Sequence, residues 1–259
     1  MRSVGIVGLG VIGQHVARAL VAGLPGLALS GVAVRDPARA TAYPTFDLAE
    51  LIKRSDIVVE AATQQALLEF GPAVLEAGKD LMVLSVGALV EVLDSWARLA
   101  SDRGGRILVP SGAIAGLDGI KGAREGSLRA VTMETRKPPR GLAGAPWIEQ
   151  NRIDLAAIRE ETLIFEGPAS AAVKAFPANV NVVAAVSLAG IGPARTAIRI
   201  YAVPGLDRNQ HRVTAEGEFG RLRIEIENVP SENPRTGKLS YLSAIAMLRD
   251  LAAPIHVGT

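Results

Sequence analysis

The chain has 259 residues, of which 49% are hydrophobic and 21% charged, so we expect folded domains with buried cores rather than disorder. Its 28 basic and 26 acidic residues nearly cancel, and no run of Lys and Arg resembles a nucleic-acid-binding surface. The sequence has no cysteine, which excludes disulfides, thiolate metal sites and thiol nucleophiles. We therefore expect neither a nucleic-acid partner nor a bound metal, and no apolar stretch is long enough to span a bilayer.

The N-terminal segment, "SVGIVGLGVIGQHVARAL", combines a short apolar strand, a glycine-rich turn and a helix. The turn is Gly8-Leu9-Gly10-Val11-Ile12-Gly13, which is the dinucleotide-binding fingerprint in its proper context. Gly8 permits a tight turn, Gly10 lets the backbone approach a pyrophosphate, and Gly13 lets the helix pack close to the strand. The helix N-terminus then presents free N–H groups to the phosphates, so we predict that Gly8, Gly10, Val11, Ile12 and Gly13 bind a dinucleotide.

The second expected strand, residues 29–36, ends in Arg35 and Asp36. An acidic residue at this position typically binds the ribose 2′-hydroxyl of NAD, whereas an arginine accommodates the 2′-phosphate of NADP. Both residue types are present, so the pattern leaves NAD and NADP open as the cofactor.

Strands and helices continue to alternate as far as residue 112, which is typical of a doubly wound parallel sheet. Ligands bind beyond the carboxyl ends of such strands, which here read "EAATQQ" (60–65, with Ala62), "SVGAL" (85–89) and "PSGAIAG" (110–116). Small residues at these ends suit the close approach of a nicotinamide ring. We predict a Rossmann domain over residues 1–112.

A different pattern follows, and it predicts a smaller mixed α+β domain over residues 113–230. Residues 129–137 and 221–229 alternate with the period of a strand, and residues 166–176 read as a helix with Pro168 in its first turn. Residues 177–190 read as another helix, with Asn179 near its start. Residues 231–259 supply a loop and an amphipathic helix that we expect to pack back on the Rossmann domain.

Of the three histidines, only His211 lies in the second domain. It shares one strand face with Val213 and Ala215, and that face is expected to be covered. A covered imidazole is usually structural, but His211 is also the natural acid–base candidate for chemistry near neutral pH. Competing bases are Lys121, Lys174 and Lys238, if burial desolvates one of them.

Five blocks in order, "SVGAL", "PSGAIAGLDGI", "ANVNVVAAVSLAG", "RNQH…EGEFG" and "ENPRTGKLSYLSA", resemble the L-aspartate dehydrogenase family over nearly the whole chain. The resemblance implies a Rossmann domain joined to an α/β substrate domain, in a cytoplasmic homodimer. It implies NAD(P)-dependent interconversion of L-aspartate and iminosuccinate, which hydrolyses to oxaloacetate and ammonia or enters pyridine nucleotide biosynthesis. The chain departs from the family pattern at Val203, where aspartate is common, and at Arg212, where glutamate is common.

By this resemblance the cofactor-contacting alanine and asparagine fall on Ala113 and Asn179, and the catalytic histidine falls on His211. We expect His211 to accept a proton from the substrate amine, and Asn209, Arg235 and Lys238 to help bind the amino dicarboxylate. Three alternatives stay open: a cyclic-imine reductase similar to dihydrodipicolinate reductase, homoserine dehydrogenase-like chemistry, for which the sequence offers no specific support, and a nucleotide-binding sensor without turnover. Semialdehyde dehydrogenases that form a thioester are excluded, because the chain has no cysteine.

Overall fold

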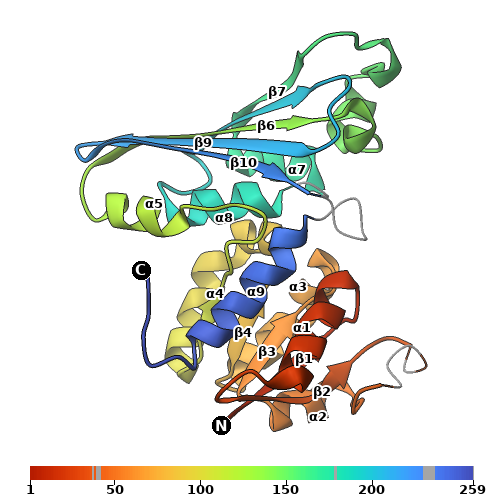
Figure 1. Cartoon of the computed structure of the whole chain (residues 1–259), viewed down its shortest axis with the longest axis vertical. Helices are drawn as coiled ribbons and strands as arrows, with labels where there is room; N and C mark the ends of the chain where they lie inside the picture. Colours follow the sequence, from red (N-terminus) through yellow and green to blue (C-terminus); the bar gives the residue numbers. More distant parts are fainter. Residues whose placement is uncertain (37, 39–41, 178–179, 230–236, 259) are drawn as a thin grey trace. The chain divides into compact units, whose positions relative to one another are not determined.

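The computed structural model describes residues 1–36, 38, 42–177, 180–229 and 237–258. The chain forms two compact units (Figure 1). The first consists of Met1–Gly112 and Ser240–Val257, and the second mainly of Ala113–Leu239.

The first unit is built on a five-stranded sheet in the order β2-β1-β3-β4-β5, with every pair parallel. The predicted doubly wound parallel sheet is therefore confirmed. The central strands are wholly apolar or nearly so, which suits strands buried on both faces. The strands are β1 (Arg2–Val7), β2 (Leu27–Ala33), β3 (Ile57–Glu60), β4 (Asp80–Val83) and β5 (Ile107–Leu108).

Helices connect these strands and cover the sheet: α1 (Val11–Gly23), α2 (Leu48–Arg54), α3 (Gln64–Glu76), η2 (Val86–Ala88) and α4 (Leu89–Arg103). The last helix, α9 (Lys238–Asp250), adds Ala244 and Leu248 to the same core as Val4 of β1 and Val16 of α1. His15 of α1 stacks on Tyr241 of α9 with ring centroids 3.8 Å apart. The C-terminal helix is thus an integral part of the first unit.

The second unit contains a mixed five-stranded sheet in the order β10-β9-β6-β8-β7. Only β6 and β8 are parallel; the other neighbours are antiparallel. The strands are β6 (Leu128–Lys137), β7 (Thr162–Pro168), β8 (Ala197–Ala202), β9 (Asn209–Gly217) and β10 (Gly220–Asn228).

The helices of this unit include α8 (Asn181–Ala189), which contacts β6 and is flanked by α5 (Leu117–Arg124) and α7 (Ala169–Ala175). Figure 1 shows these three helices on one side of the sheet. Shorter turns are η3 (Pro139–Leu142), α6 (Pro146–Gln150) and η4 (Leu155–Ala157). Within the part of the chain that the structure describes, these three helices therefore cover one face of the sheet (Figure 1).

The prediction of a helix over residues 166–176 is wrong at its start. Residues 166–168 belong to β7, where Gly167 and Pro168 pair with Ile198 and Ala197 of β8. Pro168 is extended (φ −69°, ψ 156°) and precedes the first residue of α7, Ala169. Proline at the end of an edge strand loses no ladder hydrogen bond that the sheet needs, so the strand continues through it.

Among the described residues, no helix is both long enough and apolar enough to cross a membrane.

Candidate active site

Two glycines of the turn between β1 and α1 are required by the fold itself. Gly8 has φ +93°, and a Cβ atom there would lie 2.6 Å from the carbonyl oxygen of Ala61. A Cβ atom on Gly13 would lie 2.1 Å from the carbonyl oxygen of Gly8. Side chains at either position would push the turn away from the segment after β3, so the close packing of helix and strand depends on both glycines.

Gly10 differs, because its protein neighbours leave room for a side chain. It precedes the first helical residue, Val11, and the nearest atom to a Cβ placed there would be 4.0 Å away. Its φ of −67° is open to any residue. The first turn of α1, with Val11 and Ile12, contains no acidic residue, and no side chain caps the helix. The bare backbone and open helix N-terminus fit the approach of a dinucleotide pyrophosphate.

Arg35 and Asp36 follow the end of β2 and are both exposed. The Asp36 carboxylate accepts a hydrogen bond from the backbone N–H of Ala38 at 3.2 Å. Both charged groups are accessible to a ribose or its phosphate, so their predicted roles in cofactor binding stay predictions.

Glu60, which the sequence reading did not single out, organises the carboxyl edge of the sheet. Its side chain is fully buried at the end of β3 and accepts hydrogen bonds from the N–H groups of Ala62 (2.8 Å), Leu84 (3.1 Å) and Ser85 (2.7 Å). The Ser85 hydroxyl donates to it as well, at 2.9 Å. Burial raises the pKa of Glu60, although these donors oppose the rise. The signal was available: a glutamate ends a strand, Ile57–Glu60, whose other residues are all apolar.

His211 lies on the covered face of the second sheet. Its side chain is 5% exposed, and Val213 and Ala215 on the same face are also buried, so the predicted covered face is confirmed. The ring is not enclosed by aliphatic groups alone, because its Nδ1 atom lies 3.0 Å from the hydroxyl oxygen of Thr135. Thr135 is directly opposite His211 in the pairing of β6 with β9, so the sheet register sets this contact.

Lys137 is the second ionisable group on this face, two residues beyond Thr135 on β6. It is 6% exposed, and burial lowers its pKa to about 8. Burial, and then the positive charge of Lys137, lower the pKa of His211 to about 3. At neutral pH the imidazole is therefore uncharged beside a largely protonated lysine.

The lysines predicted as competing bases are placed differently from Lys137. Lys174 on α7 and Lys238 at the start of α9 are exposed, and Lys121 on α5 is only half-buried. Lys137 was not predicted as a site residue, although it is the last residue of the strand predicted over residues 129–137. The period of two, however, puts it on the same face as Met133 and Thr135.

The loop containing Ala113 is tied to the end of the strand pair that carries His211. The carbonyl oxygen of Ala113 accepts a hydrogen bond from the Asn228 side chain at 2.8 Å. Asn228 pairs with Asn209, and Ile226 pairs with His211, in the ladder between β10 and β9. The segment predicted to contact the cofactor is therefore held two residue pairs from the candidate catalytic histidine.

Three further predicted residues are Asn179, Arg235 and Lys238. Asn179 and Arg235 lie outside the described residues. Lys238 is exposed, and its backbone N–H donates to the carbonyl oxygen of Val229 at 3.1 Å.

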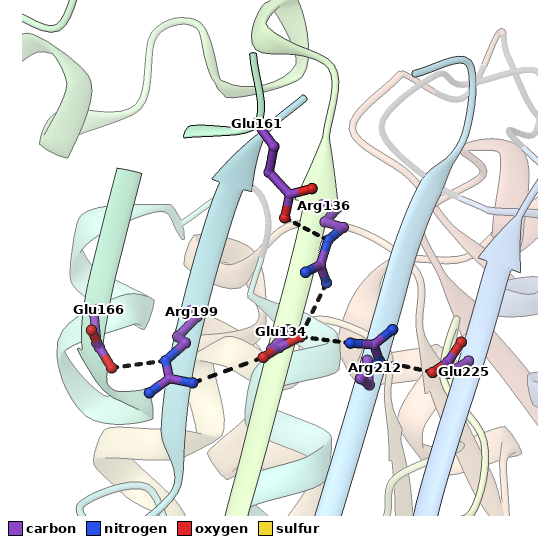
Figure 2. A network of polar contacts seen from close by, with 7 residues as sticks. All are labelled: Glu134, Arg136, Glu161, Glu166, Arg199, Arg212 and Glu225. Atoms are coloured by element: carbon purple, nitrogen blue, oxygen red, sulfur yellow. Dashed lines mark hydrogen bonds and ion pairs between the residues drawn. The ribbon is translucent and has the colours of Figure 1, made fainter. Parts of the chain in front are cut away.

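The face of the sheet opposite His211 carries a network of charges across all five strands (Figure 2). Glu134 of β6 is its centre and pairs with Arg136, Arg199 and Arg212. The outer members are Glu161, Glu166 and Glu225, which pair with those arginines. Arg212, one of the two departures from the family pattern, therefore points away from His211, because successive strand residues face opposite sides.

A polar hollow lined by Arg2, Asp56, Lys79, Asp80 and Arg106 lies at the amino edge of the first sheet, opposite the glycine turn. Ligands of doubly wound sheets bind at the carboxyl edge, so this hollow is not the candidate site. Across the described part of the chain, no cluster of three or more His, Asp or Glu side chains is arranged to hold a metal ion.

Two family profiles match the chain. The profile described as "Aspartate dehydrogenase, C-terminal" matches residues 118–251. The profile described as "Homoserine dehydrogenase, NAD binding domain" matches residues 8–110.

Similarity to individual proteins extends over the whole length. The chain is 45% identical to the L-aspartate dehydrogenase of Methanosarcina barkeri, with both chains fully covered. It is 46% identical to that of Bradyrhizobium diazoefficiens, over 99% of this chain and 94% of the relative. Among solved structures, the aspartate dehydrogenase of Thermotoga maritima superposes with a TM-score of 0.81 at 26% identity, with both chains fully covered. A homoserine dehydrogenase from Thiobacillus denitrificans, at 12% identity and a TM-score of 0.65, shares the fold over 97% of this chain and 73% of its own. The chain belongs to the L-aspartate dehydrogenase family.

Proposed function

We propose that this protein is an NAD(P)-dependent L-aspartate dehydrogenase, which oxidises L-aspartate to iminosuccinate or runs the reverse reductive amination. The observation that carries the proposal is full-length identity of 42–45% to L-aspartate dehydrogenases of several methanogens. Released iminosuccinate would hydrolyse to oxaloacetate and ammonia.

The cofactor is NAD or NADP, and it would be held by the turn Gly8–Gly13, by Ala62, and by Ala113 and Asn179. When bound, the cofactor would supply the acceptor for the hydride (the proton with its bonding electron pair) from the substrate Cα. Arg35 and Asp36 would decide between the two cofactors. An Arg35→Ala variant should raise the KM for NADP by more than that for NAD, if Arg35 binds the 2′-phosphate.

His211 would receive the proton that the substrate ammonium must lose before oxidation, directly or through a water. In the tautomer in which Nδ1 donates to Thr135, the Nε2 atom carries the lone pair needed for this step. The free imidazole is a weak base, since its pKa is about 3. A bound dicarboxylate would add negative charge near the imidazole. This charge would oppose the positive charge of Lys137, which lowers the pKa of His211, and would make the imidazole a stronger base. Asn209 and Lys238 would contact the substrate from the ends of β9 and α9, and Arg235 is proposed with them.

The experiment that tests the activity follows absorbance at 340 nm with L-aspartate and a panel of other amino acids, using NAD and NADP in turn. L-Aspartate should be oxidised in preference to the rest. A His211→Ala variant should bind cofactor normally but lose roughly 10²- to 10⁴-fold in turnover. Turnover near that of the wild type would remove His211 from the mechanism.

Other outcomes of the same assay favour the alternatives. Reduction of a cyclic imine without oxidation of any amino acid would favour a reductase similar to dihydrodipicolinate reductase. Tight cofactor binding without hydride transfer to any substrate would favour a sensor.

We further propose that the enzyme is a cytoplasmic homodimer without a nucleic-acid or membrane partner. As far as the described residues show, β7 and β10 are the edge strands of the second sheet, and an edge strand can pair with another copy of the chain. The absence of cysteine is compatible with a reducing compartment. Light scattering coupled to size-exclusion chromatography measures the mass of the assembly and tests the dimer.

A further inference from the structure

Glu60 places a buried carboxylate at the point of the first sheet where the strand order reverses. The strand that it ends, β3, pairs with β1 on the side opposite β2, so the chain passes to the other side of β1 between β2 and β3. Doubly wound sheets bind dinucleotides at this switch point, beyond the carboxyl ends of the strands. Glu60 is fully buried, and it is therefore an ionisable group built into the edge at which the cofactor is expected.

The predicted cofactor contacts divide this edge into two halves. The charged pair that follows β2 is the candidate for the adenosine ribose, and the turn Gly8–Gly13 is the candidate for the pyrophosphate. The nicotinamide nucleotide is then left with the second half of the sheet, which begins with β3 and β4. Glu60 joins the ends of these two strands, because it accepts hydrogen bonds from Ala62 after β3 and from Ser85 after β4.

The donors around Glu60 match an ionised carboxylate. Three of its four partners are the backbone N–H groups of Ala62, Leu84 and Ser85, which can only donate. The fourth is the Ser85 hydroxyl, at 2.9 Å. Burial raises the pKa of Glu60, whereas each of these hydrogen bonds lowers it. All four partners are neutral, so they hold a negative charge in place without cancelling it.

The two forms of a nicotinamide cofactor differ in the charge of the ring, which is positive when oxidised and neutral when reduced. A buried negative charge at this half of the edge stabilises the positive ring more than the neutral one, because charges interact more strongly in a partly dehydrated site than in water. We propose that Glu60 sets the balance between the two cofactor forms by favouring the oxidised nicotinamide. This inference rests on the proposed function only for its nicotinamide cofactor, and the identity of the substrate does not enter it.

The test measures the dissociation constants of the oxidised and the reduced cofactor by isothermal titration calorimetry, without substrate. It uses NAD or NADP, whichever the wild type binds more tightly. Glu60→Gln keeps the shape of the side chain and removes its charge. The affinity for the oxidised form should fall roughly 10-fold more than the affinity for the reduced form. A purely architectural role of Glu60 would weaken both forms by the same factor.

Two comparisons separate charge from architecture. Ser85→Ala removes one hydrogen bond to the carboxylate and keeps its charge, so the ratio of the two dissociation constants should stay at the wild-type value. Glu60→Asp and Glu60→Asn have side chains of equal size that differ in charge. The ratio should be closer to that of the wild type in the aspartate variant and shifted towards the reduced form in the asparagine variant. If Glu60→Gln does not fold, this pair carries the test.

Equal losses of oxidised and reduced cofactor in a folded Glu60→Gln protein would overturn the proposal, and so would a wild type that binds neither form. Where the test passes to the shorter variants, equal ratios in Glu60→Asp and Glu60→Asn would overturn it. Failure of the wild type to oxidise aspartate, with the shift in the ratio intact, would refute the proposed activity and leave this role of Glu60 standing.

Discussion

The imidazole of His211 and the hydroxyl of Thr135 lie 3.0 Å apart across neighbouring strands of the second sheet. Because the two residues are directly paired in the ladder, the contact is set by backbone register and not by a flexible loop. A hydroxyl at Nδ1 fixes the ring orientation and, when it accepts from Nδ1–H, leaves Nε2 free for a substrate proton. Thr135 is therefore a positioning residue for His211.

Replacing Thr135 by valine should lower kcat for aspartate oxidation without changing cofactor binding. Loss of one neutral hydrogen bond of about 0.5–1.5 kcal/mol corresponds to roughly a 2- to 12-fold effect. Thr135→Ser keeps the hydroxyl and is the control, so its kcat should stay near that of the wild type. Wild-type kcat in Thr135→Val would show that the hydrogen bond does not matter for turnover, because valine lacks the hydroxyl but keeps the methyl group.

The low pKa of His211 makes the stability of the protein depend on pH. The folded chain holds this imidazole neutral down to a pKa of about 3, whereas the unfolded chain protonates it near its ordinary value of 6.5. Between these values the unfolded state binds more protons, so the free energy of unfolding falls as the pH is lowered below 6.5. The stabilisation that comes from the neutral imidazole is fully present above pH 6.5. Below pH 6.5 the free energy of unfolding falls by about 1.4 kcal/mol for each unit by which the pH is lowered.

A His211→Gln variant removes this titration, so its stability should fall less steeply with acid than that of the wild type. Urea unfolding at pH 7 and pH 5 should show the wild type losing about 2 kcal/mol more than the variant over this interval. His256→Gln changes an exposed histidine and serves as the control. Parallel pH profiles for wild type and His211→Gln would mean that the ring titrates in the folded protein as it does in the unfolded chain.

Glu60 is expected to be essential for the architecture of the carboxyl edge of the first sheet. Its carboxylate accepts hydrogen bonds from Ala62, Leu84 and Ser85. Glu60→Gln keeps the shape but turns an acceptor oxygen into a donor group that faces other donors. The variant should lose about 1–3 kcal/mol in the free energy of unfolding, measured with urea. It should also bind NADH more weakly, because the segment at Ala61 packs against Gly8.

Glu76→Gln, on the exposed surface of α3, is the matched control and should leave both quantities unchanged. Wild-type stability and NADH affinity in Glu60→Gln would show that the two loops hold their positions without the carboxylate.

The sequence predicted those features that depend on periodicity and on local backbone chemistry. The strand, glycine turn and helix over residues 3–20 are encoded locally, and the alternation at His211 was sufficient to predict its covered face. Thr135 and Lys137 could not be assigned to His211, because they lie 76 and 74 residues away in sequence and only the register of β6 against β9 brings them together. Glu60 was not predicted as a site residue for a related reason. Its partners include the N–H groups of Leu84 and Ser85, which are distant in sequence and which the parallel sheet places beside it.

The two glycines Gly10 and Gly13 should respond differently to alanine, since only one of them is required by the fold. A Cβ atom on Gly13 would lie 2.1 Å from the Gly8 carbonyl oxygen, whereas the nearest atom to a Cβ on Gly10 is 4.0 Å away. Gly13→Ala should therefore cost about 1–3 kcal/mol in the free energy of unfolding, through overpacking. Gly10→Ala should leave stability within about 0.5 kcal/mol of the wild type. It should nevertheless weaken NADH binding roughly 10-fold or more, because the new methyl group occupies the space where the pyrophosphate approaches the backbone. Thermal unfolding without cofactor, paired with fluorescence titration of NADH, measures both quantities, and a Gly10→Ala protein with wild-type NADH affinity would show that the dinucleotide does not bind over this turn.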